Sequence, residues 1–193
     1  MDALGAACLE VFGHAPTRVT QLHGGDLSEV MQLRLADGTE VVAKIGPMVD
    51  REARMLVAIS ATGVPAARVL GQAAEVLFLE ALDEVRPGPS HWAQFGADLA
   101  RLHACTGDSY GWGEDYAFGP VMIYNAATED WPGFWAERRL LPFVAQIERG
   151  LGGRVERLAG RLGDLLPAAP APALLHGDLW SGNLLATEDA IHL

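Results

Sequence analysis

Two polar side chains near the end of the chain have the types and the spacing that phosphoryl transfer needs. Asp178 and Asn183 stand five residues apart, in a segment flanked by leucines on both sides. In that reaction a carboxylate orients the attacking hydroxyl, and a nearby amide oxygen helps to hold the Mg²⁺ ion that neutralises charge on the nucleotide. We therefore predict Asp178 as the catalytic base or hydroxyl-orienting group and Asn183 as a metal ligand. We expect a buried strand, Leu174 and Leu175, to lead into this loop.

The same segment has a simpler interpretation as a corner between two elements. His176, Gly177 and Asp178 could form a tight turn in which the aspartate caps backbone amides and the glycine supplies a positive φ. Short motifs of this kind also occur by chance. Further groups upstream favour the catalytic interpretation.

The first of these groups is Lys44, in the strand-like run from Glu40 to Ile45. A lysine is costly to bury without a partner. In kinases a lysine on such a strand reaches the nucleotide phosphates and pairs with a glutamate of the next helix. We predict that helix over residues 50–61, with Glu52 in its first turn and in an ion pair with Lys44. The alternative is a solvated edge-strand lysine, with Glu52 favouring only the helix N-terminus.

A glycine-containing segment lies one hairpin before the lysine strand. Its candidate nucleotide-binding residues are Gly24, Gly25 and Ser28. Glycines let backbone amides approach a phosphate closely, although a hairpin turn would also explain a Gly-Gly pair. After the last predicted strand, residues 83–89 are rich in proline and glycine and indicate a connector. We predict that the backbone before it, at Glu80 and Leu82, bonds the adenine of ATP.

The elements that must position these groups fall into two halves. Short β-prone runs occupy residues 17–22, 29–35, 39–45, 67–70 and 76–82, with Asp37-Gly38 as a hairpin turn. Helical apolar spacing occupies residues 3–13, 50–61, 90–104, 131–149 and 153–166. We therefore predict an α+β fold with an antiparallel-sheet, nucleotide-binding lobe over residues 1–85 and a mainly helical lobe over residues 86–193.

The long segment between residues 107 and 130 is a candidate substrate pocket, because loops of this length in compact domains are usually functional or disordered and aromatic residues disfavour disorder. Its polar and aromatic members include Tyr110, Trp112, Tyr116, Phe118, Tyr124 and Asn125. The next helix carries Trp135, Arg138 and Arg139, which could face an anionic or hydroxylated substrate. A solvated basic helix face explains them equally well.

Composition limits the classes of partner. The 193 residues carry a formal net charge of −11, and no cluster of Lys or Arg interrupts it, which argues against nucleic acid. No apolar run approaches the roughly 20 residues that span a bilayer, and the start of the chain lacks a basic leader. We therefore expect a cytoplasmic location and no membrane partner. Cys8 and Cys105 are predicted to be plain buried thiols.

Taken together, five segments resemble the fructosamine/ketosamine-3-kinase family, which belongs with the aminoglycoside phosphotransferase-like kinases. They are the runs 24–29, 40–45, 52–53, 134–140 and 175–183. The resemblance implies a two-lobed protein-kinase-like fold. It also implies phosphorylation, with ATP and Mg²⁺, of the sugar 3-hydroxyl of small glycated amines such as fructosamines or ribulosamines, a deglycation repair step. It makes Asp178 the catalytic aspartate, Asn183 a Mg²⁺ ligand, Lys44 the phosphate-contacting lysine and Glu52 its partner.

The sequence departs from the family pattern at two places. Ile123 stands where the family segment ending at Asn125 has glutamine, which concerns substrate identity. The strand-like run 190–193 ends the sequence just before the position of the family's second metal-binding aspartate, and Glu188 and Asp189 fall in the preceding turn. For the chain as given we expect weak metal binding, little turnover and exposed apolar surface.

Two other functions remain open at this point. One is a related phosphotransferase for an aminoglycoside, choline or similar small acceptor. The other is a nucleotide-binding fragment without catalysis, which would bind ATP but release no ADP when an acceptor is added.

Overall fold

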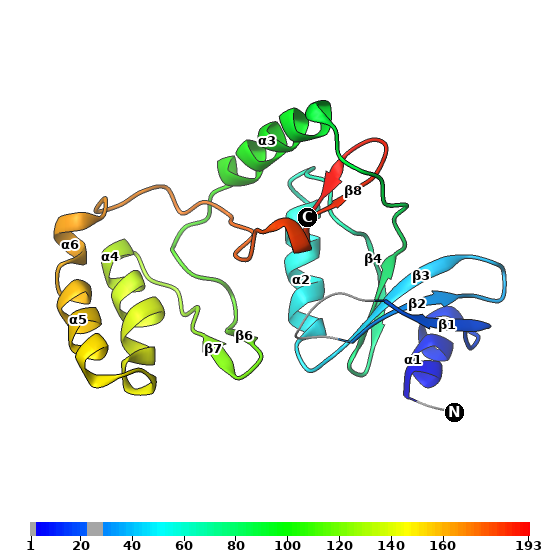
Figure 1. Ribbon diagram of the computed structural model, residues 1–193, viewed down its shortest axis with the longest axis horizontal. Coiled ribbons are helices and arrows are strands. Elements are labelled where there is room, and N and C mark those ends of the chain that lie inside the picture. Colours follow the sequence, from blue (N-terminus) through cyan, green and yellow to red (C-terminus); the bar gives the residue numbers. More distant parts are fainter. Residues whose placement is uncertain (1–2, 23–28) are drawn as a thin grey trace. The chain divides into compact units, whose positions relative to one another are not determined.

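A computed structural model describes residues 3–22 and 29–193, and the fold is α+β, as predicted (Figure 1). The chain forms two compact units, of which the first is Met1–Cys105 with Leu175–Leu193 and the second is Thr106–Leu174. The predicted lobe boundary after residue 85 therefore lies inside the first unit, because the next helix and the last 19 residues belong with the sheet. The lobe limits themselves stay a prediction.

The first unit is built on a five-stranded antiparallel sheet of order β1-β2-β3-β5-β4. Its strands are β1 (Arg18–Gln21), β2 (Glu29–Arg34), β3 (Glu40–Ile45), β4 (Val69–Ala73) and β5 (Val76–Glu80). The predicted turn between β2 and β3 is confirmed. Gly38 has a φ of 88°, which glycine adopts without strain, and the carboxylate of Asp37 accepts a 2.9 Å hydrogen bond from the backbone N–H of Thr39.

Each face of this sheet is covered by one helix. The helix α1 (Ala3–Phe12) packs on the face formed by Leu33, Val41, Ala43 and Phe78, which are all fully buried. The helix α2 (Val49–Ser60) packs on the other face, which includes Val42, Leu77 and Leu79. Side chains alternate along a strand, so Lys44 shares its face with Val42 and lies on the α2 side of the sheet.

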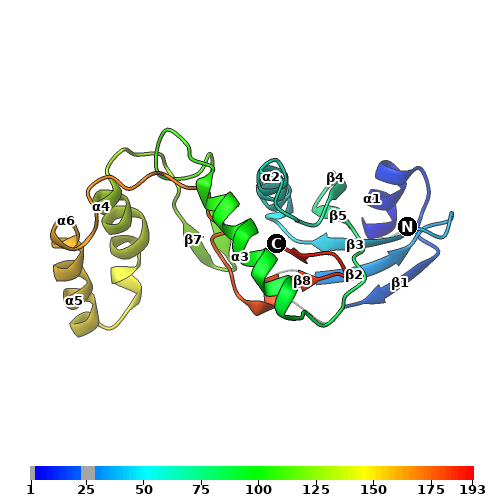
Figure 2. The same cartoon turned by 90° about the horizontal axis from the view of Figure 1, so that it is seen from above.

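Besides the 3-10 turn of Ser181–Asn183, three further elements belong to the first unit. They are the helix α3 (Pro89–Ala104) and the strands β8 (Leu185–Ala186) and β9 (Ile191–His192), which pair as a hairpin. The β9 strand confirms the strand expected over residues 190–193. The hairpin lies beside α3 (Figure 2). Two backbone hydrogen bonds connect it to the rest of the unit: Val85 N–H donates to the Ala186 carbonyl at 2.8 Å, and Leu193 N–H donates to the Pro65 carbonyl at 3.0 Å.

The second unit contains short elements where long ones were expected. The segment predicted as loop contains a hairpin of β6 (Tyr116–Phe118) and β7 (Val121–Ile123). The helical part, yellow to orange in Figure 1, consists of α4 (Trp131–Phe134), the π-helical turn η1 (Trp135–Leu140), the 3-10 turn η2 (Leu141–Gln146), α5 (Arg149–Ala159) and α6 (Leu162–Leu165).

The predicted helices over residues 131–149 and 153–166 are therefore wrong in their limits. The α-helical hydrogen bonding ends at Phe134 and gives way to the π-helical turn, and Pro142, which has no backbone N–H to donate, lies at the start of the 3-10 turn that follows. A new helix then begins where the carboxylate of Glu148 accepts bonds from Gly150 N–H and Leu151 N–H, at 2.7 Å and 2.9 Å.

Other expectations are corrected at single residues. Leu174 and Leu175 form no strand, and Leu175 is 55% exposed, so the buried strand predicted before the catalytic loop is wrong. Cys8 is fully buried as expected, whereas Cys105 is only half-buried. Among the helices that the structure describes, none combines the length and the apolar character that crossing a bilayer requires.

Candidate active site

The ion pair predicted between Lys44 and Glu52 is confirmed. The Lys44 ammonium donates a hydrogen bond to the Glu52 carboxylate, and the two side chains are 26% and 21% exposed. Only three residues separate the end of β3 from the start of α2, so the first turn of the helix lies close to the end of the strand. The alternative of a solvated edge-strand lysine is excluded, because β3 lies between β2 and β5.

This pair fixes a cation at the α2 side of the sheet. An ammonium has three N–H donors, and the bond to Glu52 uses one of them. A half-buried lysine held in this way is suited to contact a phosphate as a point charge.

The structure also brings together Asp178 and Asn183. The side-chain amide of Asn183 donates to the Asp178 carboxylate at 2.8 Å and to the Asp178 carbonyl at 2.9 Å. A 3-10 turn, η3 (Ser181–Asn183), and a φ of 87° at Gly177 shape the loop. Both polar side chains are exposed, so they are accessible to a substrate in this unit.

The donor set of this loop fits Mg²⁺, although it is small. The amide nitrogen of Asn183 faces Asp178, which leaves the amide oxygen for a hard cation. No group of three or more His, Cys, Asp or Glu side chains in the described ranges could hold a metal ion. A Mg²⁺ ion at Asn183 would therefore take its other ligands from water and from substrate phosphates, which is usual for this ion.

His176 supports the loop of Asp178 and Asn183 through a ring nitrogen that carries no proton. Burial lowers the pKa of His176, while the Asp178 carboxylate and the backbone bond from Asp178 raise it in part. Its Nδ1 accepts the backbone N–H of Asp178 at 3.3 Å, which a nitrogen without a proton can do. The histidine of this motif thus orients the backbone beside the predicted catalytic carboxylate.

Apolar side chains are exposed on the same loop. Trp180 is 59% exposed, and Leu175 and Leu179 are exposed as well. The Trp180 ring lies over Gly182, where a Cβ would clash with it. A Cβ at residue 182 would therefore displace the exposed ring from this position.

The other predicted nucleotide contacts remain predictions. Gly24, Gly25 and Ser28 lie outside the described residues. Glu80 ends β5, and its carboxylate accepts a hydrogen bond from the backbone N–H of Arg68 at 2.8 Å. This side chain therefore connects the end of β5 to the residue before β4. Leu82 is half-buried at the start of the irregular segment 81–88, whose backbone is the candidate for adenine bonding.

The second unit holds a buried polar network that the sequence did not indicate. Asn125 is 6% exposed, and its side-chain oxygen accepts a 2.6 Å bond from Arg139. Its side-chain nitrogen donates to the Glu114 carbonyl at 3.0 Å, and its backbone N–H donates to the Asp115 carboxylate at 2.6 Å. The Arg139 guanidinium also lies 4.5 Å from the centre of the Phe134 ring.

Arg139 is therefore neither a solvated basic residue nor free for a substrate. Burial lowers its pKa, and the Asp115 carboxylate opposes that shift. Arg138, its neighbour, pairs with Glu137 at 3.4 Å, and Trp135 is exposed. The signal that could have identified the network is an asparagine within an aromatic segment, since such a polar side chain needs partners once it is buried.

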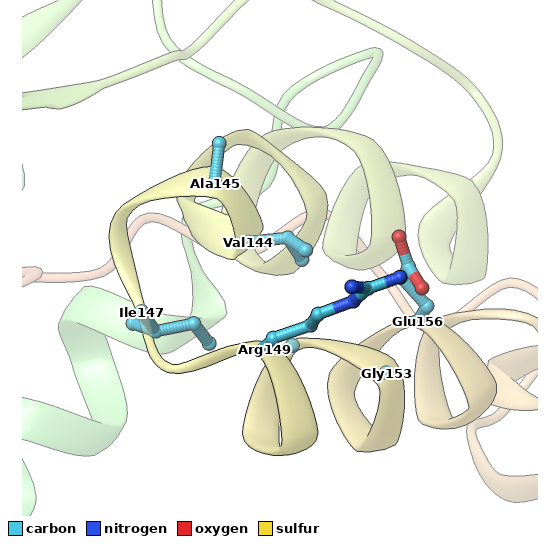
Figure 3. Close-up of a pocket in the computed structure, with 7 residues that line it drawn as sticks. Val144, Ala145, Ile147, Arg149, Gly153 and Glu156 are labelled. Carbon is cyan, nitrogen blue, oxygen red and sulfur yellow. The ribbon is translucent and has the colours of Figure 1, made fainter.

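A depression of about 500 Å³ lies in the second unit (Figure 3). It is lined by Val144, Ala145, Ile147, Arg149, Gly152, Gly153 and Glu156. The Arg149 side chain extends across it toward Glu156 (Figure 3). Because one cation and one anion line it together, it has no net charge that would select a ligand, and none of the predicted site residues contributes to it.

Comparison with known proteins relates this chain to kinases. The model of the fructosamine kinase family matches residues 6–192. A Thermus thermophilus protein named "Probable ketoamine kinase" is 38% identical over 167 residues, which are 84% of this chain and 60% of that protein.

Solved structures agree with this match. A Thermobifida fusca protein assigned to the fructosamine-3-kinases superposes with a TM-score of 0.85 and 28% identity, covering 100% of this chain and 72% of that one. The aminoglycoside phosphotransferase APH(4)-Ia superposes with a TM-score of 0.64 at 17% identity, covering 95% of this chain and 67% of that one. The second comparison shows the kinase-like fold alone. The chain spans less than two thirds of the Thermus relative, so the activity of a whole protein is a matter of proposal.

Proposed function

Because the chain belongs to the fructosamine kinase family, we propose that it carries the nucleotide-binding and catalytic groups of an ATP-dependent kinase for ketosamines. The acceptor is the 3-hydroxyl of the sugar part of a fructosamine or ribulosamine. The observation that supports this proposal is the presence, in one compact unit, of the Lys44–Glu52 ion pair and the Asp178–Asn183 pair.

The proposed reaction uses each of these groups once. Asp178 accepts a hydrogen bond from the acceptor hydroxyl, orients its oxygen toward the γ-phosphorus of ATP and takes the proton as the new P–O bond forms. The bond between the γ-phosphorus and the bridging oxygen breaks, and ADP leaves. Lys44 binds the phosphates, and Asn183 holds Mg²⁺, which neutralises charge on the phosphate oxygens when bound.

A variant of the predicted base tests this proposal. Asp178→Asn removes the proton acceptor and is expected to lower fructosamine-dependent ADP release by about 100-fold or more, the range found for general acid–base groups. Asp189→Asn is the matched control, because it makes the same chemical change at an exposed turn in the same unit. Retained turnover in Asp178→Asn would contradict the role of this residue.

A separate measurement identifies the small molecule that accepts the phosphoryl group. A panel of a fructosamine, a ribulosamine, an aminoglycoside and choline is offered to the protein with Mg-ATP, and ADP release is followed. We expect turnover with the ketosamines only. Turnover with the aminoglycoside or choline alone would assign a related phosphotransferase, and ATP binding in a thermal-shift assay without any ADP release would assign a non-catalytic nucleotide-binding chain.

A further inference from the structure

We propose that His91 is a positioning residue that ties the connector after the sheet to the hairpin that follows the catalytic loop. The proposal rests on the proposed function, because its consequence for turnover concerns Asp178 and Asn183. Its structural part can be tested without any activity.

His91 uses both ring nitrogens in the first turn of α3. Its Nδ1 accepts the backbone N–H of Gly88 at 3.0 Å. An imidazole nitrogen that accepts a hydrogen bond carries no proton, so the proton of the neutral ring is on Nε2. That Nε2 lies 3.2 Å from the Glu188 carbonyl and donates to it. The two contacts together require the neutral ring with its proton on Nε2.

The two hydrogen bonds of His91 differ in the sequence separation of the residues that they join. The bond from Gly88 is local and closes the N-terminus of α3, where the helix begins. The bond to Glu188 joins residues 97 positions apart in sequence. Helix capping needs only the first bond, so the second is available for another purpose.

The partner of the long-range bond lies next to the predicted catalytic groups. Glu188 is in the turn between β8 and β9, and β8 begins two residues after Asn183. On the other side, Gly88 lies in the connector, and Val85 in the same connector donates to the Ala186 carbonyl. The connector follows directly on the backbone predicted to bond adenine. His91 thus links the predicted nucleotide-binding backbone to the hairpin that holds the end of the catalytic loop.

Two substitutions separate the two bonds. His91→Asn keeps a side-chain acceptor near the place of Nδ1, and it cannot reach Glu188. His91→Gln places an N–H donor near the place of Nε2 and so retains the link to the hairpin. His103→Asn is the matched control, because His103 is an exposed histidine near the other end of the same helix.

The structural readout is amide hydrogen exchange of the protein. In His91→Asn we expect exchange at Val85 and in β8–β9 to rise about fivefold, as expected for the loss of one hydrogen bond, while exchange in β2 and β3 stays unchanged. His91→Gln and His103→Asn are expected to exchange like the wild type. Unchanged exchange in His91→Asn, or an equal rise throughout the sheet, would overturn the proposal.

The kinetic readout separates positioning from general stability. We expect His91→Asn to lower kcat about fivefold with an unchanged KM for ATP, and His91→Gln to restore kcat. A fall in both variants alike, or a change in KM alone, would contradict the positioning role. If the wild type has no turnover, the proposed function fails, and the exchange experiment still decides whether His91 holds the hairpin.

Discussion

The ammonium of Lys44 is bonded to the carboxylate of Glu52, and the pair joins the central strand β3 to the first turn of α2. Because this bond orients the Lys44 ammonium, the position of the ammonium depends on the Glu52 carboxylate. We expect Glu52→Gln to raise the KM for ATP about tenfold, equivalent to about 1.4 kcal/mol, because Lys44 loses the charge that orients it.

The control for this variant lies on the same helix. Asp50→Asn removes an equal charge one half-turn away, where the carboxylate bonds exposed Arg54 at 2.9 Å. Nucleotide affinity is measured by isothermal titration with Mg-ADP as well as from KM. Equal effects of the two substitutions would mean that net charge, not the pair with Lys44, determines affinity.

Close packing of the catalytic loop can be tested at Gly182. A side chain there would clash with the ring of Trp180, so Gly182→Ala should displace the indole. In protein labelled with 5-fluorotryptophan, the ¹⁹F resonance of Trp180 is assigned as the one that Trp180→Phe removes. In Gly182→Ala this resonance is expected to shift. Gly113→Ala, at a glycine with open space around it, should leave that resonance in place. An unmoved resonance in Gly182→Ala would show that the ring packs elsewhere.

The buried network of the second unit should depend strongly on Arg139. Arg139→Met leaves the side-chain oxygen of buried Asn125 without its 2.6 Å donor. We expect the free energy of unfolding to fall by about 3 kcal/mol, since loss of one partner leaves a buried polar group unsatisfied. Arg138→Met, in a more exposed pair with Glu137, is expected to cost less than about 1 kcal/mol in urea unfolding. Similar losses in both variants would argue against the network.

Acid stability of the second unit should depend on Glu148. Backbone bonds from Gly150, then from Leu151, lower the pKa of Glu148. A carboxyl group with a lowered pKa contributes stability above its unfolded pKa of about 4.3 and loses it as the pH falls through the folded pKa. Glu148→Gln has no carboxylate and therefore lacks this pH-dependent contribution to stability. Between about pH 5 and pH 3, its urea unfolding midpoint should fall less steeply with decreasing pH than that of the wild type. Glu129→Gln, in an exposed loop, serves as the control, and an unchanged slope in Glu148→Gln would contradict the capping role.

Local sequence was sufficient for much of the first unit. Short β-prone runs indicated the five strands, and the Asp37-Gly38 pair indicated the β2–β3 turn, because both signals depend on neighbouring residues alone. The pairing of Lys44 with Glu52 was also predictable, since a lysine in an apolar strand is costly to bury without a partner and a glutamate stood in the first turn of the next helix.

The second unit was less predictable, for physical reasons. Apolar spacing indicated helix over residues 131–149 but did not show that the α-helix would end at Phe134 and give way to a π-helical turn and a 3-10 turn. Similarly, leucines at residues 174 and 175 resemble a buried strand, yet no partner strand continues beyond the single bridge of Ala173 to Thr106 in the part of the chain that the structure describes. Burial depends on what packs against a segment, and the segment itself does not encode that.

The sequence by itself determined the types of chemical groups and their spacing, including the aspartate and asparagine that bond each other in the loop predicted to be catalytic. Tertiary structure alone decided which polar groups are buried and which of them form hydrogen bonds with residues far away in the sequence. It placed Arg139 on Asn125 and His91 on the carbonyl of Glu188, contacts between residues 14 and 97 positions apart. Such bonds form only when packing brings distant backbone and side chains within about 3 Å, and no local pattern of residues specifies that distance.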